Sequence, residues 1–254
     1  MKVISFFNEK GGVGKTLFST MLADFLSYKC GARVCVVDME CPSYRIKAFR
    51  DHDISQLRQI NSPLRRYMEN KGNVSYKAFD IITMGRAINE YDNEALKKIY
   101  SDLLYISDSG KYDYMIIDFP GGFSKKTPVS MLCALKFIDL MVVPMDTDAQ
   151  TRKAALIVAE AVKRSGIKTL VCWNRVTSAE MSGNILDNGE KIFNEYGIEM
   201  CRTRIRHFEK AKRDSDGRLF VRNTVCWPDR YVEMNCKELP DLFQELKEKL
   251  DCIE

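Results

Sequence analysis

Short apolar runs alternate with longer amphipathic stretches along this chain, and the alternation predicts a parallel sheet. Runs of about five apolar residues are typical of strands that are buried on both faces. The stretches between them repeat apolar residues at helical spacing. The predicted strands are Val3–Phe7, Arg33–Asp38, Tyr114–Asp118, Leu140–Pro144 and Lys168–Trp173, with a weaker one near Glu199–Arg204. We therefore predict an α/β fold, a doubly wound and mostly parallel sheet with helices on both faces.

Three helices follow from the same periodicity. The first covers Lys15–Lys29 between the first two strands, and Gly31 is its predicted C-cap. The second covers Thr151–Ser165 and is ended by Gly166. A closing helix is predicted over Leu239–Leu250, where leucine and phenylalanine side chains share one face.

The stretch from Asp51 to Ser109 gives the weakest pattern, because it is polar and broken at Ser62-Pro63 and at 71–73. Glu94–Leu104 is its clearest helical piece. Two interpretations are open, a helical insertion or lid, and helices packed on the face of the sheet; the pattern favours the second. Since there is no linker, repeat or low-complexity tract, we predict a single domain over 1–254 with a helical segment at about 51–110.

Composition narrows the class of protein only slightly. The 39 basic and 35 acidic side chains give a net charge of +4, which does not by itself indicate nucleic acid. Nine cysteines, odd in number and never in C-x-x-C spacing, suggest neither a disulfide framework nor a zinc or iron–sulfur site. No signal peptide and no apolar run of roughly 20 residues is recognisable, so a soluble, cytoplasmic protein is expected.

A glycine-rich loop lies between the first strand and the first helix. The segment 9–16 reads E-K-G-G-V-G-K-T, and it almost fits the phosphate-loop pattern G-x-x-x-x-G-K-[ST], except that Glu9 replaces the first glycine. Its glycines let backbone N–H groups surround an anion, while Lys15 can reach the phosphates and Thr16 can ligate Mg²⁺. The alternative, an ordinary glycine-rich turn, is disfavoured by the Gly-Lys-Thr sequence at the helix start.

Acidic residues follow two of the predicted strands. Asp118 ends the strand Tyr114–Asp118 and precedes a turn, Phe119-Pro120-Gly121-Gly122; Asp38 and Glu40 follow the second strand. The carboxyl ends of parallel strands meet at one edge of the sheet, where a carboxylate can hold Mg²⁺ or orient a water molecule. A lone Asp after a strand is most often a cap, so the argument depends on the loop beside it.

The loop with its additional lysine resembles the deviant Walker-A motif of the ParA/MinD superfamily, a SIMIBI-class group of ATPases that includes the nitrogenase iron protein. The resemblance extends over most of the chain, through Y-D-Y-M-I-I-D-F-P-G-G, V-V-P-M-D-T-D and Asn174-Arg175. Residues 41–111 match loosely or lie outside it. Among members, the chain is most similar to small ParA-type partition ATPases of plasmids and conjugative elements.

The resemblance implies Mg²⁺ and ATP as cofactors and an ATP-dependent homodimer. Lys10 would reach the partner's phosphates and act in the manner of an arginine finger. Asn174 would read adenine, and Arg206 lies in the segment that would pack on the base. The candidate catalytic residues are Lys10, Lys15, Asp38 and Glu40, and the candidate metal ligands are Thr16, Asp38 and Asp118. The candidate nucleotide contacts are Gly11, Gly12, Val13, Gly14, Lys15, Thr16, Leu17, Asn174, Arg175 and Arg206.

Three residues depart from the family pattern. Glu40 stands where the family has the second Asp of D-x-D-P, and its additional methylene predicts slow hydrolysis, because a displacement of about 1 Å can cost roughly a hundredfold in rate. Leu17 replaces a hydroxyl residue after Gly-Lys-Thr. Phe119 replaces a small or hydroxyl residue after Asp118, which is the candidate for the Walker-B Asp of the family.

Members of the superfamily act on non-specific DNA or on a membrane. The tail 245–254 is mixed to acidic, which disfavours a membrane anchor. The densest basic run predicts a DNA surface, although its first half also suits the solvated face of an edge strand. Its members are Arg202, Arg204, Arg206, Lys210, Lys212 and Arg213.

Three functions are therefore open. The first is a ParA-like switch in segregation or maintenance of a plasmid or mobile element, activated by a ParB-like partner. The second is a nucleotide-gated scaffold with little hydrolysis, and the third is a metabolic synthetase relative. An iron-protein reductase is disfavoured because no pair of cluster cysteines is recognisable.

Overall fold

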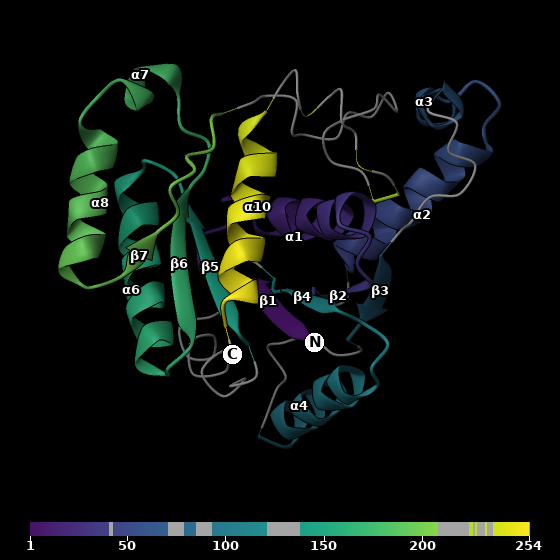
Figure 1. Ribbon diagram of the computed structural model, residues 1–254, viewed down its shortest axis with the longest axis horizontal. Coiled ribbons are helices and arrows are strands. Elements are labelled where there is room, and N and C mark those ends of the chain that lie inside the picture. Colours follow the sequence, from purple (N-terminus) through teal and green to yellow (C-terminus); the bar gives the residue numbers. More distant parts are fainter. Residues whose placement is uncertain are drawn as a thin grey trace.

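The computed structural model describes residues 1–40, 43–70, 79–84, 93–120, 138–207, 224–225, 227, 232 and 236–253. Seven strands form one sheet in the order β3-β2-β4-β1-β5-β6-β7 (Figure 1), and all of its described strand pairs are parallel. The strands are β1 Lys2–Phe6, β2 Val34–Asp38, β3 Asp80–Thr83, β4 Tyr114–Asp118, β5 Leu140–Met145, β6 Lys168–Trp173 and β7 Glu199–Met200. The predicted α/β class is confirmed.

Two strand predictions need correction. The interpretation of 51–110 as helical missed β3, a four-residue strand on the edge of the sheet beside β2. The weak strand predicted over Glu199–Arg204 is only two residues long in β7. The chain beyond it still follows the sheet, because Cys201 N donates to Val171 O over 2.8 Å and Arg206 bridges to Val176.

The described helices connect these strands. Their bounds are α1 Lys15–Asp24, α2 Arg45–Arg58, α3 Pro63–Asn70, α4 Asn93–Asp108, α6 Ala149–Arg164, α7 Ser178–Met181, α8 Ile185–Glu195 and α10 Glu238–Asp251. The helix predicted over Lys15–Lys29 finishes as a π-helical turn, η1 Phe25–Lys29. Gly31 and Gly166, at φ +68° and +80°, follow the helix ends as predicted.

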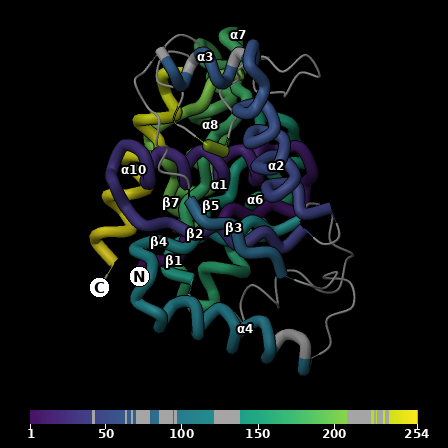
Figure 2. The backbone as a smooth tube through the Cα atoms, turned by 90° about the vertical axis from the view of Figure 1, so that its right-hand side faces the viewer, coloured from purple at the N-terminus to yellow at the C-terminus, as the bar shows by residue number. Residues whose placement is uncertain are grey.

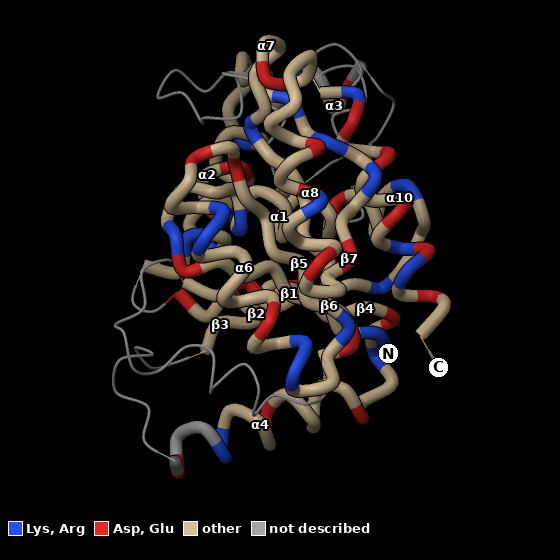
Figure 3. Tube along the Cα trace, turned by 90° about the vertical axis from the view of Figure 1, so that its left-hand side faces the viewer, with Lys and Arg blue, Asp and Glu red and all other residues tan. Residues whose placement is uncertain are grey.

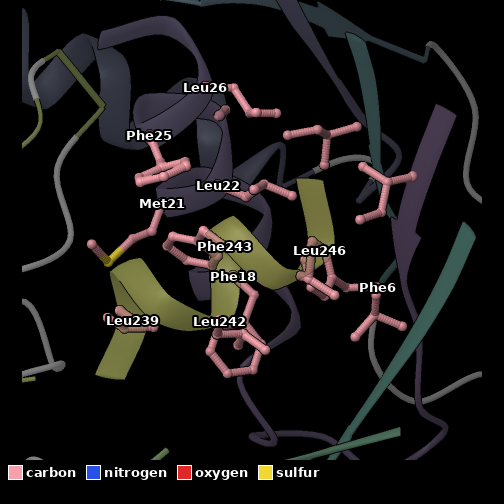
Figure 4. Close-up of a cluster of buried hydrophobic side chains, with 14 of the residues drawn as sticks. Phe6, Phe18, Met21, Leu22, Phe25, Leu26, Leu239, Leu242, Phe243 and Leu246 are labelled. Atoms are coloured by element: carbon pink, nitrogen blue, oxygen red, sulfur yellow. The ribbon is translucent and has the colours of Figure 1, made fainter. Parts of the chain in front are cut away.

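Helices cover both faces of the sheet (Figure 1), and each face has its own apolar core. Side chains of α4, α6 and α8 fill one core, whereas α1, η1 and α10 fill the other. In the second core Phe25 packs against Trp227 and Phe243, at ring-centroid distances of 5.5 and 5.8 Å. Figure 4 shows Phe25 and Phe243 within this cluster. Both α1 and α10 contact strands of the sheet on this face, and their shared core gives the loop that precedes α1 a rigid support.

The segment at 51–110 follows both interpretations in part. Ile99 and Leu103 of α4 lie in a core of the sheet, as expected for a helix packed on its face. In contrast, α3 packs through Leu64 and Met68 on α2 and Val225. Figure 2 shows α3 beyond α2, away from the strands. The break predicted at Ser62-Pro63 separates α2 from α3, whereas the one at 71–73 lies outside the described residues.

Candidate functional site

The loop between β1 and α1 has the backbone geometry of a phosphate loop. Gly12 and Gly14 have φ of +80° and +102°, a region that residues with a Cβ atom rarely adopt. Gly14 takes the N-cap position of α1 and has no side chain with which to cap it. The first backbone N–H groups of α1 can therefore be offered to an anion, and the helix dipole favours negative charge there.

Lys15 begins α1 and turns its ammonium group back into the loop. Its side chain is buried, and Nζ donates to Asn8 O and to Lys10 O, both over 2.9 Å. Burial lowers the pKa of Lys15 to about 8, against the attraction of Asp118 and Glu40. The ammonium group and the N–H groups at the start of α1 are the donors that a phosphate group needs, so the loop fits the nucleotide that the sequence predicts.

Asn8 anchors the loop, a role that the sequence did not reveal. Its side chain is fully buried, with Nδ2 donating to Pro144 O over 2.9 Å and Oδ1 accepting from Lys10 N over 3.0 Å. The loop is thereby attached to the end of β5. A polar residue directly after an apolar strand was the available signal.

Lys10 and Glu9 are both exposed. Lys10 Nζ lies 3.5 Å from Gln150 Oε1, at the start of α6. Asp148 is the N-cap of that helix and accepts from Gln150 N and Thr151 N, so its position in V-V-P-M-D-T-D has a structural explanation. The exposure of Lys10 is compatible with a contact to a second molecule, and its role in trans remains a prediction.

Two acidic residues end neighbouring strands directly opposite each other. Asp38 of β2 and Asp118 of β4 are paired in the strand register, and both are buried. Ser19 Oγ, one turn into α1, donates to Asp118 Oδ1 over 2.8 Å. Ser19 was not recognised in the sequence. The Walker-B candidate is therefore held by the same helix that begins at the loop.

Asp38 supports the start of α2. Its Oδ2 accepts from Ile46 N over 2.9 Å and its Oδ1 accepts from Glu40 N over 3.2 Å. Burial raises the pKa of Asp38, while these backbone donors and Arg45 oppose the rise. Glu40 forms an ion pair with Arg45, with 3.0 Å between Oε1 and Nε. Both acids of this motif thus have partners within the chain.

Mg²⁺ would need oxygen ligands beyond the protein at this site. Among the described residues, no three His, Cys, Asp or Glu side chains lie close enough to hold a metal ion. Thr16 is half-buried in the first turn of α1, and Asp38 and Asp118 lie at the neighbouring strand ends. Hydroxyl and carboxylate oxygens suit Mg²⁺, which usually keeps waters and substrate phosphates as its other ligands. The donor set therefore fits a metal that arrives with a nucleotide.

Asn174 and Arg175 hold the loop from the end of β6. Asn174 is buried; its Nδ2 donates to Val13 O over 2.8 Å and its Oδ1 accepts from Arg175 N over 2.9 Å. Arg175 has a left-handed backbone at φ +61°, and its Nη1 lies 3.3 Å from Gly12 O. To contact adenine as predicted, the side-chain amide of Asn174 would have to give up one of these hydrogen bonds.

Two of the departures from the family pattern have a packing explanation. Leu17 is buried in the core that α1 shares with α10. Phe119 packs edge-to-face on Phe7, with ring centroids 6.0 Å apart and planes at 81°. The aromatic residue after Asp118 is therefore held by the residue that follows β1. Gly121 and Gly122 of the turn after Asp118 lie outside the described residues.

The described arginines of the basic run are each paired with acids. Arg202 Nε lies 3.7 Å from Glu245, Arg204 contacts Glu190 and Asp187 at 2.9 and 2.8 Å, and Arg206 pairs with Glu238. Figure 3 shows basic and acidic residues intermixed on the side of the molecule where α8 and α10 are labelled. These pairs reduce the positive charge that the run offers to DNA. Lys210, Lys212 and Arg213 lie outside the described residues.

Comparison with known proteins finds relatives by family model and by fold. A family model described as an AAA domain matches residues 1–164. No curated protein matches the chain. Among solved structures, MinD of Aquifex aeolicus, in complex with MinC, is 18% identical with a TM-score of 0.61, covering 98% of this chain and 96% of that one.

Two further structures are similar over their whole length. The pNOB8 ParA bound to nonspecific DNA is 20% identical with a TM-score of 0.63, covering 100% of this chain and 99% of that one. A variant of McdA from Cyanothece in complex with ATP is 18% identical with a TM-score of 0.63, covering 99% and 96%. At identities this low, the likeness shows a shared fold. Separately, none of the described helices is long and apolar enough to cross a membrane.

Proposed function

Because this chain belongs to the AAA-domain family whose model it matches, and with it to the ParA/MinD superfamily of ATPases, we propose that it is a ParA-like, Mg-ATP-dependent dimerisation switch. The observation that carries the proposal is the buried Lys15, whose ammonium group lies inside a loop of positive-φ glycines. Such a cation is costly to bury unless it has an anion to bind.

Each side chain of the site has a role in this proposal. Lys15 and the loop N–H groups would bind the phosphates, and Thr16, Asp38 and Asp118 would hold Mg²⁺. When bound, Mg-ATP supplies the phosphoryl group that is transferred to water. Glu40 orients that water and accepts its proton. Asn174 and Arg175 keep the loop in place, and a contact of Asn174 with adenine would replace its bond to Val13.

We propose further that ATP binding brings two copies together, with Lys10 of each reaching the phosphates of the other. The dimer would bind DNA without sequence preference and would be released by a ParB-like partner, in segregation or maintenance of a plasmid or mobile element. Support comes from the fold shared with a ParA bound to nonspecific DNA. The protein would work as a single domain in the cytoplasm, on the nucleoid while it holds DNA.

The test combines oligomeric state with turnover. Gel filtration with ATP, with ADP and without nucleotide should show a dimer in ATP alone, and DNA should stimulate phosphate release. Lys15→Ala should abolish nucleotide binding, whereas Lys10→Ala should keep binding and lose turnover. A monomer under all three conditions would contradict the switch, and equal effects of the two substitutions would contradict the role of Lys10 in trans.

A second candidate function, a nucleotide-gated scaffold, is favoured by one observation. The carboxylate of Glu40, the proposed water-orienting group, lies 3.0 Å from the guanidinium of Arg45. An ATP-dependent dimer whose phosphate release stays at background, even with DNA and a partner protein, would identify the scaffold. Glu40→Asp also distinguishes the switch from the scaffold. Faster turnover in this variant would show that hydrolysis is limited by the length of the side chain.

A further inference from the structure

The first turn of α2 breaks the usual rules for a helix start. It carries Arg45 and Lys47 and no acidic residue, although the N-terminal end of a helix favours negative charge. The residue before it, Tyr44, is left-handed at φ +35° and makes no side-chain capping bond. Local rules are most often broken at functional sites, where other contacts compensate.

The compensation comes from the end of β2, which is part of the candidate site. Asp38 Oδ2 accepts from Ile46 N over 2.9 Å, in place of a cap. Tyr44 N donates to Glu40 O over 2.6 Å, and Tyr44 Oη donates to Met84 O over 2.8 Å. The Glu40 carboxylate then reaches forward to Arg45 Nε at 3.0 Å. The start of α2 and the acidic motif are therefore one connected unit.

The two partners of the ion pair differ in exposure. The Arg45 side chain is 60% exposed, whereas that of Glu40 is 15% exposed. Arg45 also lies near enough to the loop to contribute to the lowered pKa of Lys15 and to oppose the raised pKa of Asp38. A cation at the rim of the site thus contacts the one carboxylate that the proposed reaction needs as a proton acceptor.

We propose that Arg45 is a positioning residue that restrains Glu40, holding its carboxylate in an ion pair and thereby slowing ATP hydrolysis. This inference rests on the proposed function, since it assigns the regulation of the same site. A carboxylate oxygen that accepts from the Arg45 guanidinium is turned toward that side chain and is less available to orient a water molecule. Because Arg45 is largely exposed, solvent screens the pair, and Glu40 can be released at small cost.

The length of the Glu40 side chain contributes to the ion pair with Arg45. Its additional methylene, compared with the Asp of the family pattern, extends the carboxylate toward Arg45. An Asp at position 40 would be too short to keep the contact. Arg45 and Glu40 are therefore expected to act as a pair, so that removing either partner removes the restraint that the other provides.

The test compares Arg45→Gln and Arg45→Met with Lys47→Gln, which removes the same charge from the same turn and leaves the pair intact. The Arg45 variants should raise kcat for phosphate release about two- to fivefold, the range of an exposed ion pair, with KM for ATP unchanged. Lys47→Gln should match the wild type, and Arg45→Lys should retain the slow rate. In a Glu40→Asp background, Arg45→Gln should have no further effect.

The outcomes separate the two proposals. ATP binding by the wild-type protein, measured first by equilibrium dialysis, tests the proposed function, and its absence overturns both proposals. With binding established, an unchanged or lower kcat in both Arg45 variants overturns the restraint alone, as does an equal increase in Lys47→Gln. Two Arg45 substitutions are used because one of them could lower the yield of folded protein without affecting the other.

Discussion

Ser19 donates its hydroxyl hydrogen to Asp118 Oδ1 over 2.8 Å, and both side chains are buried. The bond joins α1, the helix that follows the glycine loop, to the carboxyl end of β4. A carboxylate that is fixed by the helix of the loop keeps its orientation relative to Lys15 and Thr16, which begin that helix. Ser19 is therefore a positioning residue for the proposed Mg²⁺ site.

Ser19→Ala should weaken both the fold and the metal site. The substitution leaves a buried carboxylate with one donor fewer, which costs about 1–3 kcal/mol of unfolding free energy. Urea denaturation measures this loss, and the Mg²⁺ concentration needed for half-maximal phosphate release should rise. The matched control is Ser27→Ala, since Ser27 Oγ is buried without a hydrogen-bond partner among the described residues. Equal losses in both variants would contradict a specific role for Ser19.

Nucleotide affinity should fall as pH rises above 8. Burial lowers the pKa of Lys15 to about 8, so its ammonium group loses its proton above that pH, while phosphates bind the protonated form. The dissociation constant for ATP should increase by up to about tenfold per pH unit between pH 8 and 10. Calorimetry in buffers of different ionisation enthalpy should show close to one proton taken up at pH 9 and little at pH 7. Constant affinity and no proton uptake would contradict the lowered pKa.

Gly14→Ala should destabilise the loop. A Cβ atom at position 14 would lie 2.5 Å from Asn174 Nδ2, and alanine rarely adopts the φ of +102° found there. The expected cost is about 2–4 kcal/mol of unfolding free energy. The control is Gly11→Ala, where no described atom lies within 4 Å of the added Cβ. Its unfolding free energy should stay within about 0.5 kcal/mol of the wild type. Similar melting temperatures for both variants would refute the clash.

Asn174→Ala separates two roles of this residue. Since its amide donates to Val13 O, we expect the free energy of unfolding to fall by about 1 kcal/mol. The affinities for ATP and for GTP should fall by the same factor as each other. The relevant measurements are thermal unfolding and competition binding with both nucleotides. A loss confined to ATP would instead support the adenine contact that the resemblance implies.

Much of the fold could be predicted from the sequence because buried parallel strands leave a simple signature. Tyr114–Asp118 and Lys168–Trp173 are apolar runs, and the structure has strands with those bounds. β3 escaped prediction because Asp80–Thr83 is short and lies on the sheet edge. It is a strand because β2 pairs with it, and a partner chosen by tertiary structure leaves no local pattern.

Residues of the candidate site could likewise be predicted only where their partners are close in sequence. Gly12, Gly14 and Lys15 could be predicted, because a strand, a glycine loop and a helix are adjacent in sequence. Asn8 and Ser19 could not, since their partners lie 136 and 99 residues away. The pairing of the basic run with acids was hidden for the same reason, because Glu238 and Glu245 belong to α10.

The carbonyl oxygens of Asn8 and Lys10 give the Lys15 ammonium group an internal substitute for phosphate oxygens. Nucleotide binding is then a ligand exchange, in which Lys15 gives up two backbone acceptors for stronger ones. The measured affinity is a difference between two sets of bonds. Residues that never contact the nucleotide, such as Asn8, can therefore tune that affinity by changing how firmly the loop holds its own lysine.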